Sequence, residues 1–152
     1  MANVYYQSTV QLIFAVRKRE ALITPDFKIT LLKYISGFLM NQDHKPLAVN
    51  CVADHLHILF GMRPCDIPAL VNDLKSDSSE FVNRKKLSRF HFQWQDSYGF
   101  FTYHLSDRKR MIRYVENQER HHYGKTFREE YVETLKDHDI EYNEKYLFDF
   151  FE

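Results

Sequence analysis

The chain has 152 residues, which suits one domain built around a single hydrophobic core. No run of about 20 apolar residues is present, as a membrane span would need, and the start of the chain lacks a signal-peptide pattern. The two cysteines have no metal-type spacing and fit a reducing compartment. We therefore expect a cytoplasmic protein with no membrane partner.

The net charge is zero, with 21 basic and 21 acidic residues, but the charge is unevenly distributed. Residues 127–152 contain nine acidic and three basic residues, a net charge of −6, so residues 1–126 carry +6. A basic body with an acidic end permits a polyanionic partner.

The first part of the chain alternates strand and helix patterns. Val4 to Val16 is rich in β-branched and aromatic residues and predicts a strand. Thr24, as a cap before Pro25, predicts a helix over residues 25–40. Two further strands are expected at residues 47–52 and 54–60, and the short link between them indicates an antiparallel hairpin.

The pattern continues with a second helix that opens at Asp66. A fourth strand region follows at residues 90–103, bent or bulged at Gly99. Ser106 is expected to cap a third helix over about residues 107–122, and a short helical pattern then begins near Phe127.

This order predicts an α+β fold with a ferredoxin-like βαββαβ antiparallel sheet and two helices on one face. The opposite face is then open for the third helix or for ligands. We expect residues 1–125 to form the domain, with residues 126–152 as an acidic extension packed on it.

The residues that organise the chemistry are two histidines in the third predicted strand. Because side chains alternate along a strand, His55 and His57 project to one face. Leu56, Ile58 and Phe60 project to the other face, under the helices. Two imidazoles on one face can form half of a metal site, although a bare His-x-His pair also occurs by chance.

The third helix carries a second pair of polar residues. Tyr114 and Gln118 are four residues apart, so one lies a turn above the other beside the apolar stripe. A phenol and an amide at this border could equally be ordinary residues of an amphipathic helix.

Together these residues resemble a known family. His55-Leu56-His57 has the His-hydrophobic-His form of the HUH nucleases, and residues 114–118 resemble the Tyr-x-x-x-Gln helix of the single-tyrosine HUH transposases. Asn117-Gln118 followed by His121-His122 is most similar to the REP-associated tyrosine transposases. The resemblance covers roughly residues 5–125. Ser97 and Tyr103-His104 depart from the usual pattern.

The resemblance implies a transposase that cleaves and rejoins single-stranded DNA at hairpin-marked ends. His55, His57 and Gln118 would hold Mg²⁺ or Mn²⁺, which would polarise the phosphate. Tyr114 would attack it and form a 5′-phosphotyrosine intermediate. Because one tyrosine holds one cut end, a homodimer is also implied.

Basic residues and one tryptophan are candidates for weak DNA contacts, although each basic residue alone fits a solvated charge and Trp94 fits the core equally well. The candidates are Arg17, Lys18, Arg19, Lys75, Arg84, Lys85, Lys86, Arg89, Trp94 and Arg110.

Three other functions can be weighed against the transposase interpretation. A histidine-triad hydrolase would need a third histidine at position 59, which is Leu59. A non-catalytic ferredoxin-like nucleic-acid-binding protein would explain the fold and the basic residues but not Tyr114 with Gln118. A domesticated regulatory relative would keep the four residues of the predicted chemistry without using them for catalysis; these are His55, His57, Tyr114 and Gln118.

Overall fold

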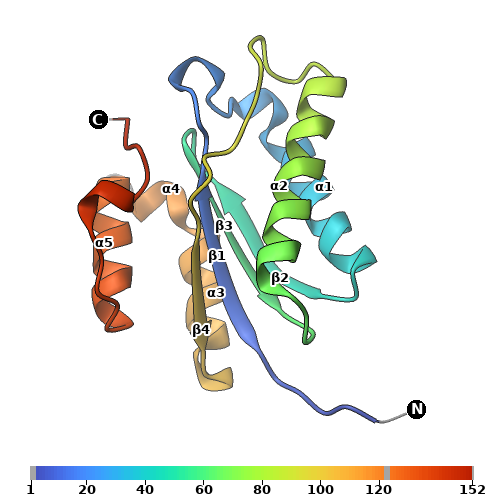
Figure 1. Cartoon of the computed structure of the whole chain (residues 1–152), viewed down its shortest axis with the longest axis vertical. Helices are drawn as coiled ribbons and strands as arrows, with labels where there is room; N and C mark the ends of the chain where they lie inside the picture. The colour runs from blue at the N-terminus through green and yellow to red at the C-terminus, as the bar shows by residue number, and fades with distance from the viewer. Residues whose placement is uncertain (1–2, 122–123, 152) are drawn as a thin grey trace.

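The computed structural model describes residues 3–121 and 124–151 (Figure 1). The strands form one antiparallel sheet in the order β2-β3-β1-β4. Their bounds are β1 Thr9–Ala15, β2 Lys45–Cys51, β3 His55–Gly61 and β4 Gly99–Tyr103. The helices are α1 Pro25–Asn41, α2 Ile67–Arg84, α3 Arg108–Glu116, α4 Gln118–His121 and α5 Phe127–Asp137. The predicted α+β, ferredoxin-like arrangement is confirmed.

Two layers of helices enclose the sheet. Figure 1 shows α1 and α2 on one face and α3, α4 and α5 on the other. Leu56, Ile58 and Phe60 of β3 join the core beneath α1 and α2, as their alternation predicted. On the other face, Leu59 packs against Met111 and Val115 of α3 in a second, smaller core.

The local helix signals hold for the first two helices. The Asp66 carboxylate accepts a hydrogen bond from the Ala69 backbone N–H at 3.1 Å and caps α2. Thr24 is the N-cap of α1 but makes no side-chain capping bond, and Pro25 occupies the first turn. No described helix is both long and apolar enough to span a membrane.

The two strands outside the β2-β3 hairpin, β1 and β4, are shorter than the sequence predicted. β1 begins at Thr9, because Thr9 pairs with Gly61 and Tyr103, where both neighbouring strands end. The fourth strand begins only at Gly99, and residues before it contribute an isolated bridge between Trp94 and Val16.

The predicted third helix is also corrected, because it divides at Asn117 into α3 and α4. The Asn50 side-chain amide on β2 donates to the carbonyls of Val115 and Glu116, at 3.0 and 3.1 Å, where α3 ends. Ser106 is not the cap: its backbone N–H donates to Nδ1 of His104. The expected end of this helix at residue 122 lies outside the described residues.

The histidine face of the sheet was expected to be free for the third helix or for ligands; α3 does pack there, but α5 covers it as well. The stripe of Phe127, Tyr131 and Leu135 on α5 is buried in the same core as β1 and α1. An amphipathic helix must bury such a stripe, and this face of the sheet is where α5 does so. The histidines therefore lie beneath a helix.

Candidate metal and nucleophile site

His55 and His57 lie side by side on β3, as the strand alternation predicted. Their ring centroids are 5.1 Å apart, and both side chains are fully buried. Phe127, at the start of α5, stacks on His55 with 3.6 Å between centroids and an angle of 3° between the ring planes. The two imidazoles are therefore held rigidly and away from bulk water.

Each histidine is oriented through its Nδ1 atom. Nδ1 of His55 lies 2.8 Å from Oδ1 of Asp54, and Nδ1 of His57 lies 2.8 Å from Oε1 of Gln11. Both partners are acceptors, so they favour the tautomer in which Nδ1 carries the proton. The lone pair of Nε2 is then available to bind a Lewis acid such as a metal ion.

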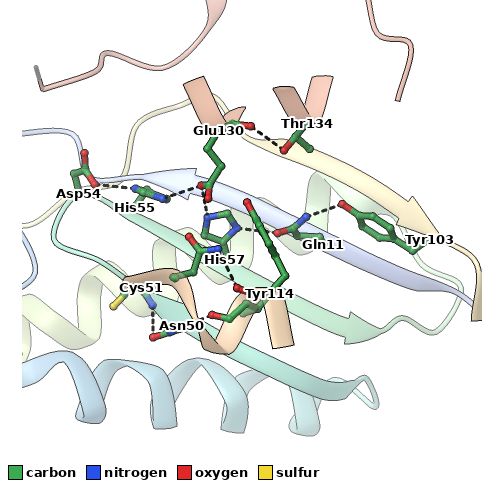
Figure 2. A network of polar contacts seen from close by, with 12 residues as sticks. Gln11, Asn50, Cys51, Asp54, His55, His57, Tyr103, Tyr114, Glu130 and Thr134 are labelled. Carbon is green, nitrogen blue, oxygen red and sulfur yellow. Dashed lines mark hydrogen bonds and ion pairs between the residues drawn. The ribbon is translucent and has the colours of Figure 1, made fainter. Parts of the chain in front are cut away.

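The two Nε2 atoms converge on Glu130 of α5. Oε1 of Glu130 lies 3.1 Å from Nε2 of His57 and 3.5 Å from Nε2 of His55 (Figure 2). The Glu130 residue is 4% exposed. A carboxylate at this depth requires positive partners, such as protonated imidazoles or a metal ion.

Gln118, the predicted third ligand, lies at the start of α4 and is fully buried. Its Nε2 donates to the carbonyl of Tyr114 at 3.3 Å. Its Oε1 is buried without a hydrogen-bond partner among the described residues. A buried acceptor of this kind usually has a ligand or an ordered water in the working protein.

The donor set fits a divalent cation. One donor atom from each of His55, His57 and Glu130 lies within 4.8 Å of the others, and all three residues are buried. Two imidazoles with a carboxylate form a mixed N/O set that suits Mn²⁺ in particular. Glu130 is thus a candidate ligand beside the predicted Gln118.

Tyr114, the predicted nucleophile, lies on α3 next to this group. Its ring centroid is 6.0 Å from that of His57, with the planes at 81°. Burial raises the pKa of the Tyr114 phenol above its ordinary value, and the charge of Glu130 and its hydrogen bond to the phenol raise that pKa further. Tyr114 is therefore a neutral phenol at neutral pH until a cation or base acts on it.

A cavity of about 770 Å³ lies between α3, β4 and α5. Tyr114 and Glu130 contribute to its wall, so it gives access to the site from solvent. Arg110, Arg120 and Lys125 also line the cavity and bring positive charge. Acidic residues are present too, and Lys125 pairs with Glu133.

Four residues of the site escaped the sequence prediction: Gln11, Asn50, Phe127 and Glu130. Glu130 had a usable signal, because it lies three residues after Phe127 and one before Tyr131, on the buried stripe of α5. A charged residue on an apolar stripe must have a buried partner. Gln11 and Asn50 had no comparable signal, because neighbouring strands bring them to the site.

The predicted DNA contacts fall into two groups. Eight of the basic residues are exposed: Arg17, Lys18, Arg19, Arg84, Lys85, Lys86, Arg89 and Arg110. In Figure 1 the turn after β1 and the segment after α2 lie at the same end of the molecule. Arg110 lies elsewhere, on α3, and pairs with Asp107 at 3.5 Å.

The structure gives the other two candidates internal partners. Trp94 is 5% exposed, and its indole N–H donates to Oγ of Ser78 at 2.9 Å. Lys75 donates to the carbonyls of Gln95, Asp96 and Ser97 at 2.7, 2.9 and 2.9 Å. Trp94 therefore lies in the core, which is one of the two alternatives left open for it, and its ring has no face open to a base. The DNA contact predicted for Lys75 stays a prediction, although its ammonium already has backbone partners.

Two solved structures are similar to this chain in fold. The chain is similar in structure to a protein from Deinococcus radiodurans R1 classed as a transposase, with TM-score 0.60 and 23% identity over 78% of this chain and 95% of that one. It is also similar to a REP-associated tyrosine transposase bound to a REP hairpin, with TM-score 0.58 and 13% identity over 80% of this chain and 73% of that one. No curated protein sequence matches the chain.

At these sequence identities the two structures establish only the fold. Membership of a family rests on a separate match to a sequence pattern. The sequence pattern of the family described as "Transposase IS200 like" matches residues 4–118, which is well over half of the chain and includes His55, His57, Tyr114 and Gln118. The chain therefore belongs to the IS200-like transposase family.

Proposed function

We propose that this transposase cleaves and rejoins single-stranded DNA through a covalent bond between Tyr114 and a 5′-phosphate. One observation carries the proposal: within a single chain, Tyr114 lies beside a buried group of two imidazoles and a carboxylate. This arrangement combines a nucleophile with a candidate cation site.

In the proposed cleavage step, the phenol oxygen of Tyr114 attacks the phosphorus of a phosphodiester. The bond from phosphorus to the 3′-oxygen breaks, and that oxygen takes up a proton and leaves as a 3′-hydroxyl. The hydrogen bond to Glu130 orients the phenol, and the proton that the phenol loses passes to solvent through the cavity that Tyr114 lines. The 3′-hydroxyl of another strand can reverse the reaction, which joins the strands and restores the tyrosine.

His55, His57, Glu130 and Gln118 are the residues that would hold a divalent cation, Mg²⁺ or Mn²⁺. When bound, the ion supplies a Lewis acid for the phosphate and a positive charge that favours the phenolate. The residues of the chain supply orientation, because both Nδ1 atoms are fixed by acceptors.

The substrate we propose is hairpin-containing single-stranded DNA. The solved relative bound to a REP hairpin supports this choice, as do the exposed basic residues after β1 and after α2. Binding should weaken strongly as the salt concentration rises. Two cut ends require two tyrosines, so we also propose that two copies of the chain act together during strand transfer.

The test is incubation of a 3′-labelled hairpin-containing strand with the protein and Mn²⁺, followed by a search for a covalent protein–DNA adduct, because the piece 3′ of the cut is the one that stays on the tyrosine. Tyr114→Phe should abolish the adduct while DNA binding persists. Tyr34→Phe, on the far side of the sheet in α1, is the matched control and should still form it. If the wild-type protein binds the hairpin but forms no adduct, a non-catalytic DNA-binding role is the better assignment.

A further inference from the structure

We infer that Gln11 is a positioning residue for His57. The Gln11 amide determines which ring nitrogen of His57 is presented to a metal ion. Gln11 lies on β1, the strand next to β3, and is 1% exposed. In the register of the two strands Gln11 is opposite Leu59, so it lies diagonal to His57 on the same face of the sheet. This inference rests on the proposed metal site.

The Gln11 amide bridges two side chains that are far apart in sequence. Its Nε2 donates to the Tyr103 hydroxyl at 2.8 Å, and its Oε1 lies 2.8 Å from Nδ1 of His57 (Figure 2). With the amide nitrogen directed to Tyr103, the amide oxygen is directed to His57. His57 must then donate from Nδ1, which leaves Nε2 on the side of Glu130.

His55 shows the alternative way to hold an imidazole through its Nδ1 atom. His55 has a carboxylate, Asp54, at the equivalent position on Nδ1. The two imidazoles of the site therefore have different supports, one charged and one neutral. A neutral amide holds the ring without adding a negative charge next to Glu130, which already contacts both imidazoles.

Tyr103 extends this chain of hydrogen bonds to the cavity. Gln11, Tyr103 and Tyr114 all contribute to the cavity wall. Tyr103 packs against His138 of the tail with 5.2 Å between ring centroids, so the phenol is held in place from the far side. The rotamer of Gln11 is therefore fixed at both ends.

The test measures Mn²⁺ affinity by electron paramagnetic resonance, with no DNA present. Gln11→Met keeps the length of the side chain but removes the acceptor, and it should weaken Mn²⁺ binding by about tenfold to a hundredfold. Gln11→Glu restores an acceptor of the kind that His55 has, and it should bind Mn²⁺ within a few fold of the wild type. A residue that only fills space would give the reverse order, since methionine suits a buried position better than an unneeded carboxylate.

Wild-type affinity in Gln11→Met, with a folded protein by circular dichroism, would overturn the role of Gln11 and leave the metal site intact. Absence of Mn²⁺ binding in the wild-type protein would instead overturn the metal site, and the role of Gln11 with it. If Gln11→Glu does not fold, the comparison of Gln11→Met with the wild type still decides the question. Tyr103→Phe should give a smaller loss of affinity than Gln11→Met, because it removes one of the two restraints on Gln11.

Discussion

The carboxylate of Glu130 lies 3.1 Å from Nε2 of His57, although 73 residues separate the two in the chain. The contact joins the acidic end of the chain to the strand that carries the histidine pair. It also explains how a helix with acidic residues in its first turn can bury part of its surface: the carboxylate is matched by two imidazoles.

The first prediction concerns Glu130 as a metal ligand. Glu130→Gln keeps the shape of the side chain but removes its charge, so we expect Mn²⁺ affinity to fall by at least about tenfold. Glu129→Gln is the matched control, because Glu129 precedes it on the same helix and is exposed. Calorimetric titration of both variants with Mn²⁺ checks this. Equal affinities in the two variants would remove Glu130 from the ligand set.

The second prediction concerns pH. Burial and the charge of Glu130 raise the pKa of Tyr114 above the ordinary value of about 10. The phenolate fraction therefore grows with pH throughout the neutral range. The single-turnover cleavage rate should rise up to tenfold per pH unit between pH 6.5 and about 8.5 at saturating Mn²⁺. A rate that falls with rising pH, with DNA binding unchanged, would contradict phenolate attack.

Local patterns in the sequence were sufficient for the histidine pair and for most elements. The alternation at His55-Leu56-His57 correctly placed both imidazoles on one face, and Asp66 correctly marked the start of α2. These features depend on neighbours within a few residues. The break at Asn117 and the position of α5 depend instead on residues from other parts of the chain.

The difference between local patterns and distant contacts also explains why the position of α5 over the histidines was not predicted. The stripe of Phe127, Tyr131 and Leu135 predicted a helix, but periodicity does not show which surface the helix will cover. That choice is made by packing against β4 and the aromatic residues of the tail, such as Phe148. A surface thought to be open was therefore the one that α5 buries.

The third prediction concerns Lys75, whose ammonium donates to three consecutive backbone carbonyls and lies over the rings of Phe14 and Tyr98. Lys75→Met leaves those carbonyls without their donor, so the free energy of unfolding should fall by about 1–3 kcal/mol. Lys85→Met, at the exposed end of α2, should change it by less than about 0.5 kcal/mol.

The same pair of variants tests the DNA contact predicted for Lys75. Urea denaturation gives the stability, and fluorescence anisotropy with a labelled hairpin gives the DNA affinity. We expect Lys75→Met to weaken DNA binding no more than Lys85→Met does. A much larger loss of affinity with unchanged stability would place Lys75 on the DNA-binding surface.

The last prediction concerns Gly99, at the start of β4. A Cβ atom at this position would lie 2.7 Å from a ring carbon of Phe101 and from the hydroxyl of Tyr131, and 2.8 Å from a ring carbon of Tyr131. Tyr131 follows Glu130 on α5, so a change that displaces its ring also displaces the carboxylate. Gly99→Ala should therefore lower the free energy of unfolding by about 1–3 kcal/mol and weaken Mn²⁺ binding severalfold.

Gly37→Ala provides the control for Gly99→Ala, because Gly37 lies in α1 and a Cβ atom there would meet no atom within 4 Å. Alanine favours a helix over glycine, so this change should raise the free energy of unfolding by about 0.5–1 kcal/mol and leave Mn²⁺ binding unchanged. The two glycine changes are expected to act in opposite directions, because only at Gly99 does the packing of α5 on β4 leave no room for a Cβ atom. If both variants are stabilised, or if Gly99→Ala binds Mn²⁺ as the wild type does, α5 does not hold Glu130 through this contact.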